Sequence, residues 1–343
     1  MEEKSYYELL ESELEIRKEK PSGTKNIIKW IFSHIKFLLI PGSSIEELNQ
    51  REYEYERSIS RRKFIRRFKS ILSIIGIVIV FGIISLAIFP NWISTFTFEQ
   101  ANGVFPGSWG PPSPNHPLGQ ANFGRDVLAR MIYGARTSIT VALPAIGFSV
   151  CLGVVFGVVA AYYGGWIDTV IMRLADILLA FPGLILALVF LSVFSEIFNT
   201  GVQIEYIMIA WGILGVPFYA RLIRASVLQA RELPYIQAAK VSGAGNWRIM
   251  FKHILPNVIQ PIIISLTFNI GGIILALAGL SFLGFSDPRM IDWGNSISEA
   301  RQFLYSAPWA SMGPGFMILI AVLGFMLLGD GLRDALDPRL KNL

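Results

Sequence analysis

The chain has 343 residues, of which 53% are hydrophobic and only 16% are charged, and its formal net charge is +5. Soluble domains carry about 25% charged residues, so this composition and a mean hydropathy of +0.51 exclude an ordinary soluble domain and predict an all-α membrane protein with several spans. A positive net charge also fits nucleic-acid binding, but the excess of Lys and Arg in the cytoplasmic segments of membrane proteins explains it more simply. No nucleic-acid partner is expected.

The segment 1–60 is polar and of mixed charge, which predicts a cytoplasmic N-terminal extension. Its first residues are acidic and polar, so no signal peptide is expected. An apolar stretch within it, 27–40, carries Lys29, His34 and Lys36 and is shorter than the about 20 residues that a membrane span needs. An interfacial helix on the membrane surface is the favoured interpretation of this stretch, and a helix packed within a soluble unit is the alternative.

The first span is expected at 71–90, which has the required apolar length. A basic cluster precedes it and by the positive-inside rule stays in the cytoplasm, so this helix leads outward; the cluster consists of Arg61, Arg62, Lys63, Arg66, Arg67 and Lys69. The segment 91–135 is rich in Pro and Gly and predicts an external loop with little regular structure. Only Val127 to Ile132, near its end, have the spacing of an apolar helical stripe. Residues 61–135 thus comprise the first transmembrane helix and an external loop.

Five further spans follow from apolar length and make up a transmembrane core, 136–332. They are expected at 138–162, 170–194, 204–220, 258–285 and 314–328. The second of them contains Phe181-Pro182, which predicts a kink. The segment 286–312 is a second external loop, in which Asp287 and Asp292 are expected to be solvated. Six spans place both termini in the cytoplasm, the C-terminal one as a basic tail, 333–343.

The segment 221–257 is the most polar interruption of the apolar C-terminal two thirds. Pro234 suits the first position of a short helix, because it lacks an N–H donor that would be unpaired there anyway. Gly243 can end that helix in a left-handed conformation. Asn246 is then expected to cap a second short helix, which Pro256 ends before the next span begins. The sequence predicts a helix–turn–helix between two membrane spans.

The residues of this loop resemble the EAA loop of permease subunits from bacterial and archaeal ABC importers. The stretch YIQAAKVSGAGNWRIMFKHILPN is similar to the dipeptide/oligopeptide (DppC/OppC-type) branch, and so is the tail GDGLRDALDPRLKNL. The resemblance covers the chain from about Phe64 onward and implies a MetI-like (type I ABC importer) permease fold with six transmembrane helices. It assigns the coupling to the ATPase to Gln237, Ala238, Ala239, Gly243, His253, Leu255 and Pro256. Gln237 departs from the usual Glu and keeps its size but not its charge.

The same resemblance implies a membrane subunit that is not itself an enzyme. Its expected partners are a second permease subunit in a heterodimer, two ATP-binding cassette subunits and an extracellular substrate-binding protein, all at the cell membrane. ATP is bound by the partner subunits, so no cofactor is expected on this chain. Di- and oligopeptides are the implied substrates, and oligosaccharides or nickel are alternatives for the same machinery.

The residues themselves indicate no catalytic or metal site. The chain lacks a G-x-x-x-x-G-K-[ST] motif, so it cannot hydrolyse ATP by that route. Its three histidines, His34, His116 and His253, lie in different segments without metal-ligand spacing. Cys151, the one cysteine, lies in an apolar run and is expected to be a small core residue.

Charges within predicted spans are candidate functional groups. Arg173 and Asp176 are three residues apart on one helix and are expected to form a structural ion pair near the cytoplasmic boundary; a substrate or ion relay is the alternative. A stand-alone secondary transporter would need coupling charges at mid-membrane and usually internal repeats. The sequence shows neither, so an importer subunit is the favoured interpretation.

Overall fold

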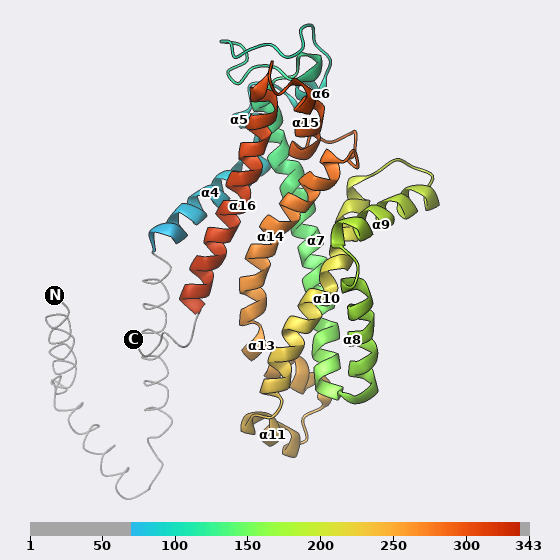
Figure 1. Ribbon diagram of the computed structural model, residues 1–343. Coiled ribbons are helices and arrows are strands. Elements are labelled where there is room, and N and C mark those ends of the chain that lie inside the picture. The colour runs from blue at the N-terminus through green and yellow to red at the C-terminus, as the bar shows by residue number, and fades with distance from the viewer. Residues whose placement is uncertain (1–69, 337–343) are drawn as a thin grey trace, which may run out of the picture. The chain divides into compact units, whose positions relative to one another are not determined.

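The computed structural model describes residues 70–336 of the chain, which belong to one compact unit that begins at Arg66. Within this range the secondary structure is helical, apart from one isolated bridge between Gln120 and Asp126. Figure 1 shows the arrangement of these helices. The predictions for the extension 1–60, the interfacial helix 27–40, the basic cluster and the end of the tail lie outside the described residues.

Five of the described helices are long and apolar enough to cross a membrane. They are α4 (Ile71–Ile88), α7 (Val127–Tyr163), α10 (Ile204–Ala230), α14 (Gln260–Phe282) and α16 (Pro308–Leu336). A sixth candidate is a pair, α8 (Gly165–Leu179) and α9 (Gly183–Ile197), whose axes meet at 93°. The six predicted spans therefore correspond to five long helices and one broken pair.

The break between α8 and α9 lies at Phe181-Pro182. Proline has no N–H donor and disfavours the helical conformation in the residue before it. A new helix starts beyond it, with the Leu186 N–H donating to the Pro182 carbonyl at 3.0 Å. The predicted kink is confirmed, and the bend of 93° is that of a broken span or a re-entrant loop.

Several helices are longer than predicted, because hydropathy marks only the apolar part of a helix. Helix α7 begins at Val127, where the Asp126 Oδ1 atom accepts from the Ala129 N–H at 2.7 Å, so the stripe predicted in the external loop is its first turn. Helix α10 continues to Ala230, well into the predicted polar loop. Helix α16 starts at Pro308 and runs to Leu336, which extends it into the predicted tail.

One end of the described unit carries short elements, and we call it the α15 end. These elements are α5 (Pro90–Ile93), α6 (Phe98–Asn102), the 3-10 turns η1 (Asn122–Gly124) and η3 (Arg301–Phe303), and α15 (Trp293–Ala300). The opposite end carries α11 (Pro234–Val241), and we call it the α11 end (Figure 1). Helix α7 runs from one end to the other.

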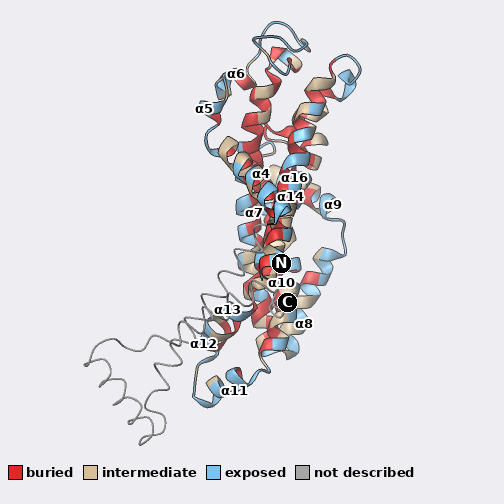
Figure 2. Cartoon of the chain, turned by 90° about the vertical axis from the view of Figure 1, so that its left-hand side faces the viewer, coloured by how far each residue is buried: buried red, intermediate tan, exposed pale blue. Residues whose placement is uncertain are grey.

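The core is built around α7 and α10, which approach closely at two glycines of α7. A Cβ atom on Gly157 would lie 2.3 Å from the carbonyl oxygen of Ala220, and one on Gly153 would lie 2.8 Å from that of Val216. Figure 2 shows the buried residues concentrated along the long helices, whereas α8, α9 and α11 are largely exposed. Helix α8 contributes one buried residue, Ala175. The two glycines of α7 thus permit its close approach to α10. Small residues serve this purpose between helices in lipid, where no hydrophobic effect drives helices together.

Gly157→Ala is expected to destabilise the protein by about 1–3 kcal/mol, because the added methyl group would overlap backbone atoms of α10. Gly147→Ala in the same helix is the matched control, since a Cβ atom there meets nothing within 4 Å. That control should be neutral, or stabilising by up to about 1 kcal/mol through helix propensity. Thermal unfolding of both purified variants in nanodiscs checks the difference. Equal melting temperatures would contradict the close approach of α7 and α10.

Candidate functional site

The loop between α10 and α14 forms a compact group of short helices. Helix α11 starts at Pro234, as predicted. After a turn follow α12 (Asn246–Arg248), the π-helix η2 (Ile249–Ile254) and α13 (Leu255–Val258). The chain thus makes a helix–turn–helix between two long apolar helices.

The turn after α11 depends on Gly243, whose φ of +76° lies in the left-handed region. The Gly243 N–H donates to the Lys240 carbonyl at 3.0 Å, and the Ala244 N–H donates to the Ala239 carbonyl at 3.1 Å. A Cβ atom on Gly243 would meet nothing within 4 Å. The requirement for glycine is therefore one of backbone conformation, which confirms the predicted left-handed end of the helix.

Two details of the predicted second helix are wrong. Asn246 is not its cap, since Gly245 holds that position without a side-chain bond; the Asn246 Oδ1 atom instead accepts from the Tyr162 hydroxyl at 2.9 Å. Pro256 does not end the helix but lies inside α13, directly after the π-helix. A π-turn is a common way to accommodate an interruption of the regular hydrogen-bond ladder.

Three isoleucines fasten this loop to the core. Ile236 of α11 and Ile249 and Ile254 of η2 are fully buried, in the same cluster as Val158 of α7 and Ile223 of α10. The end of α7 adds polar ties, because the Arg231 Nη1 atom donates to the carbonyl of Ala161 at 2.6 Å. The loop is therefore packed against α7 and α10. Sequence reasoning missed these anchors, although isolated isoleucines in a polar loop are a usable signal.

The residues that the EAA resemblance singles out lie together on this loop. Gln237, Ala238, Gly243 and Pro256 are exposed, and Ala239, His253 and Leu255 are half-buried. Ala238 is thus small at a place where packing within the chain does not require it. Large apolar side chains stand out beside it, with Val241 90% and Trp247 70% exposed. Exposed bases complete this surface; they are Lys240, Arg248 and Lys252. We call this face of α11, α12, η2 and the turn between α11 and α12 the α11 surface.

The ion pair predicted between Arg173 and Asp176 is wrong. Asp176 pairs with Arg221 of α10, and the salt bridges of the described residues include none from Arg173. A second pair joins the same two helices, since the Arg224 guanidinium forms two bonds of 2.6 Å to the carboxylate of Asp168. Spacing along one helix could not reveal partners on a helix 45 residues further along the chain.

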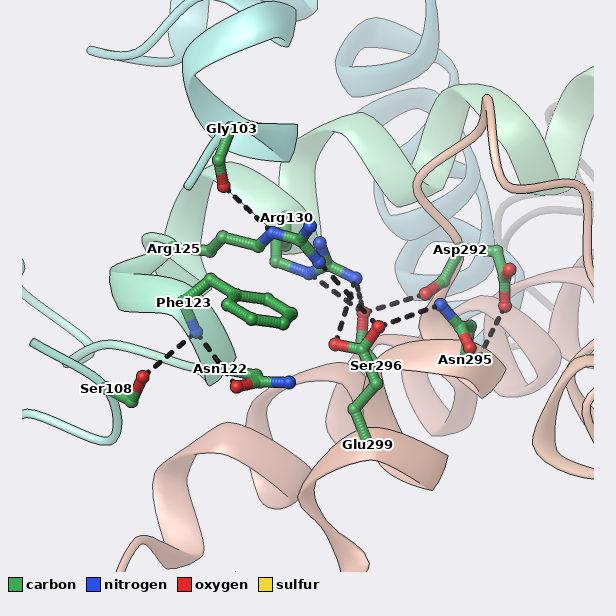
Figure 3. A network of polar contacts seen from close by, with 10 residues as sticks. All are labelled: Gly103, Ser108, Asn122, Phe123, Arg125, Arg130, Asp292, Asn295, Ser296 and Glu299. Carbon is green, nitrogen blue, oxygen red and sulfur yellow. Dashed lines mark hydrogen bonds and ion pairs between the residues drawn. The ribbon is translucent and has the colours of Figure 1, made fainter. Parts of the chain in front are cut away.

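A polar network holds the α15 end together (Figure 3). Arg130 of α7 is buried, and its Nε and Nη2 atoms each lie 3.2 Å from the hydroxyl oxygen of Ser296 in α15. Glu299 lies 3.8 Å from Arg130 and 3.7 Å from Arg125. The Arg125 Nε atom donates to the Gly103 carbonyl at 3.0 Å, beyond α6. The network joins α7, α15 and the loop that follows α6.

The two aspartates predicted to be solvated are buried. Asp292 caps α15 by accepting from the Asn295 N–H at 2.7 Å, and burial raises the pKa of its carboxyl above the ordinary value. Burial acts the same way on Asp287, but hydrogen bonds from Arg289 and from the Ile204 N–H outweigh it, so the pKa of Asp287 is lowered. Both carboxylates act as structural caps, Asp287 at the start of α10.

Comparison with known proteins agrees with this geometry. Residues 153–342 match the family model of binding-protein-dependent transport system inner membrane components. The chain is 41% identical to the dipeptide transport system permease protein DppC of Alkalihalophilus pseudofirmus, over 82% of this chain and 90% of that protein. It is 38% identical to the DppC protein of Haemophilus influenzae, over 79% and 91% of the two chains. The glutathione transport system permease protein GsiD of Pectobacterium atrosepticum is 36% identical, over 82% and 92%.

The matched residues 153–342 include the α11 surface, the Arg221 and Arg224 pairs, and α15 and η3 of the α15 end, and the relatives are matched over nearly their whole length. Identity at this level over most of both chains, together with a fold of long apolar helices, settles the family. The chain belongs to the binding-protein-dependent transport system inner membrane components, as an ABC transporter permease of the DppC/OppC type.

Proposed function

We propose that this chain is one of two permease subunits in an ATP-driven importer of di- and oligopeptides. It forms half of the translocation pathway, with six spans if the bent pair α8–α9 counts as one, and with both termini in the cytoplasm. The complex contains two separate ATP-binding cassette subunits, one of which binds the α11 surface, and an extracellular substrate-binding protein docks at the α15 end. The chain itself performs no catalysis and holds no cofactor.

The observation that carries this proposal is the α11 surface. It combines small exposed residues, protruding apolar side chains and bases, and it is fastened to the long helices by three buried isoleucines. A surface of this kind can transmit the motion of a partner to the long helices only if the partner binds it. The relatives are named as dipeptide and glutathione permeases, which supports peptides as the cargo over oligosaccharides or nickel.

Purification of the tagged chain from its native membrane tests the proposal. We expect a second permease and two ATPase chains to co-purify, and the complex in proteoliposomes to take up dipeptides only with ATP and the binding protein. Uptake by the chain alone, driven by an ion gradient, would instead establish a secondary transporter.

The external loop offers a test of docking at the α15 end. Residues 111–115 are all exposed, whereas the flanking His116 is held by Asp126 at 3.0 Å. Replacing 111–115 by two glycines should reduce the ATPase stimulation by the binding protein several-fold and leave the basal rate intact, because only the exposed tip is removed. Steady-state ATPase assays with and without the binding protein measure this. Undiminished stimulation would argue against docking through this loop.

A further inference from the structure

A charged cavity of about 510 Å³ lies beside α8 and α10, toward the α11 end. Five of its lining residues carry charge; they are Asp168, Arg173 and Asp176 from α8 and Arg221 and Arg224 from α10. Three arginines against two aspartates leave this lining with a net charge of +1. Helical spacing places the α8 residues on one face of that helix.

The three arginines of this cavity differ in how fully they are paired with carboxylates. Arg224 is fixed by its two bonds to Asp168. Arg221 has one carboxylate oxygen of Asp176 as its partner, and both side chains remain 47% exposed. Arg173 is exposed and takes part in none of the salt bridges of the described residues. The cavity thus presents one uncommitted guanidinium next to a second that is only partly satisfied.

Exposed charges on membrane-spanning helices are unfavourable against lipid tails and indicate contact with water or polar groups. The opposite face of α8 is different, since Val170 and Leu174 are exposed there to 48% and 60%. Helix α8 therefore has one apolar face that suits lipid or a partner helix and one charged face that suits an aqueous passage.

A second cavity, of about 230 Å³, lies further along α10. Its lining is neutral and mostly apolar, and it includes the aromatic side chains of Trp211, Phe218 and Tyr219 from α10 and the amide of Asn269 from α14. The Asn269 amide donates to the Tyr219 hydroxyl at 3.0 Å. Only one residue, Ala220, separates Tyr219 from Arg221. From Gly215 to Arg224 the helix rises about 14 Å, which is the length of about four extended residues, so one short peptide can reach both cavities.

We propose that the two cavities are consecutive contact sites for a short peptide on its way through this subunit. The charged cavity binds the free carboxylate terminus at Arg173 and Arg221, and the neutral cavity holds backbone amides and apolar side chains. Guanidinium groups bind carboxylates through paired hydrogen bonds, whereas a neutral oligosaccharide has no carboxylate that could form such an ion pair. This inference rests on the proposed function and names the group of the cargo that the subunit recognises.

Cysteine accessibility tests whether the passage is aqueous and occupied by peptide. The chain has one native cysteine, so Cys151→Ser provides a background for Thr169→Cys in the cavity lining and Leu174→Cys on the opposite face as the matched control. In the complete transporter, an anionic thiol reagent should modify only the Thr169 variant, and a saturating dipeptide during ATP turnover should slow that reaction. Equal modification at both positions, or no effect of peptide, would overturn the proposal. Protection that depends on phosphatidylglycerol in the vesicles instead of peptide would assign the site to a lipid headgroup and also overturn it.

Uptake kinetics test the assigned group. Arg173→Gln should raise the KM for a free dipeptide about tenfold and leave the KM for its C-terminal amide unchanged, with Arg173→Lys in between. Affinities of the binding protein for both peptides, measured separately, remove its own selectivity from the comparison. A wild-type complex without ATP-dependent peptide uptake would reject the proposed function. A wild-type complex that imports both peptides, with Arg173→Gln unchanged or impaired equally for both, would reject this inference alone.

Discussion

Ala239→Glu and Gly243→Val are expected to abolish ATP-dependent uptake while the chain still inserts into the membrane. If the α11 surface lies in a groove of the ATPase, a glutamate at position 239 buries an unpaired charge there, at a cost on the order of 3 kcal/mol. Valine at position 243 would have to adopt a φ of +76°, which a β-branched residue rarely does. It would therefore turn α11 away from its present direction.

Gln237→Glu is the matched control on the same surface. Gln237 is exposed, and its side chain makes only a long contact of 3.5 Å to the Arg231 carbonyl, so a carboxylate fits there without strain. This variant should retain wild-type uptake. Co-purification of the ATPase together with uptake in proteoliposomes measures all three variants. Normal coupling in Ala239→Glu would mean that α11 does not enter a partner, and the importer proposal would lose its main support.

Arg130→Ala should destabilise the α15 end by about 3 kcal/mol or more. Removing one member of a buried charged network leaves its partners uncompensated; here Glu299 keeps only Arg125 at 3.7 Å, and the hydroxyl of Ser296 loses its two donors. For a unit of this size, that loss corresponds to a fall in melting temperature of about 6 °C or more.

Arg301→Ala is the control for Arg130→Ala. Arg301 is exposed, and its guanidinium lies over the Phe282 ring at 5.7 Å, so its loss should change the stability by about 0.5 kcal/mol or less. Thermal unfolding of both variants in nanodiscs provides the comparison. Similar melting temperatures would show that the buried network contributes little to stability.

Local rules predicted much of the fold correctly. Pro234 at the start of α11, the positive φ of Gly243 and the break at Phe181-Pro182 each follow from the conformational limits of one or two residues. Apolar length found the five long helices, because a span must be apolar wherever it meets lipid. It misplaced their ends, because a helix such as α7 continues beyond the hydrocarbon core with polar residues.

Contacts between distant segments could not be predicted in this way. Asp176 pairs with Arg221 of another helix and not with its near neighbour Arg173. Asp292 is buried although it lies in a polar loop. Each outcome depends on which helices pack together, and one sequence contains no direct record of that. The burial of Ile236 in the candidate site was missed for the same reason.

Helix α7 has 37 residues and is therefore about 55 Å long, well beyond the about 30 Å of a hydrocarbon core. Its first turns carry Arg130 and the external network, and its last turn carries Tyr162, which donates to the loop of α11. Pro144 lies close to its midpoint. If α7 tilts as one rigid body about this midpoint, a tilt of about 10° moves each tip by about 5 Å, in opposite directions. Docking of the binding protein at one tip and closure of the ATPase at the other would then be coupled through the same tilt of α7.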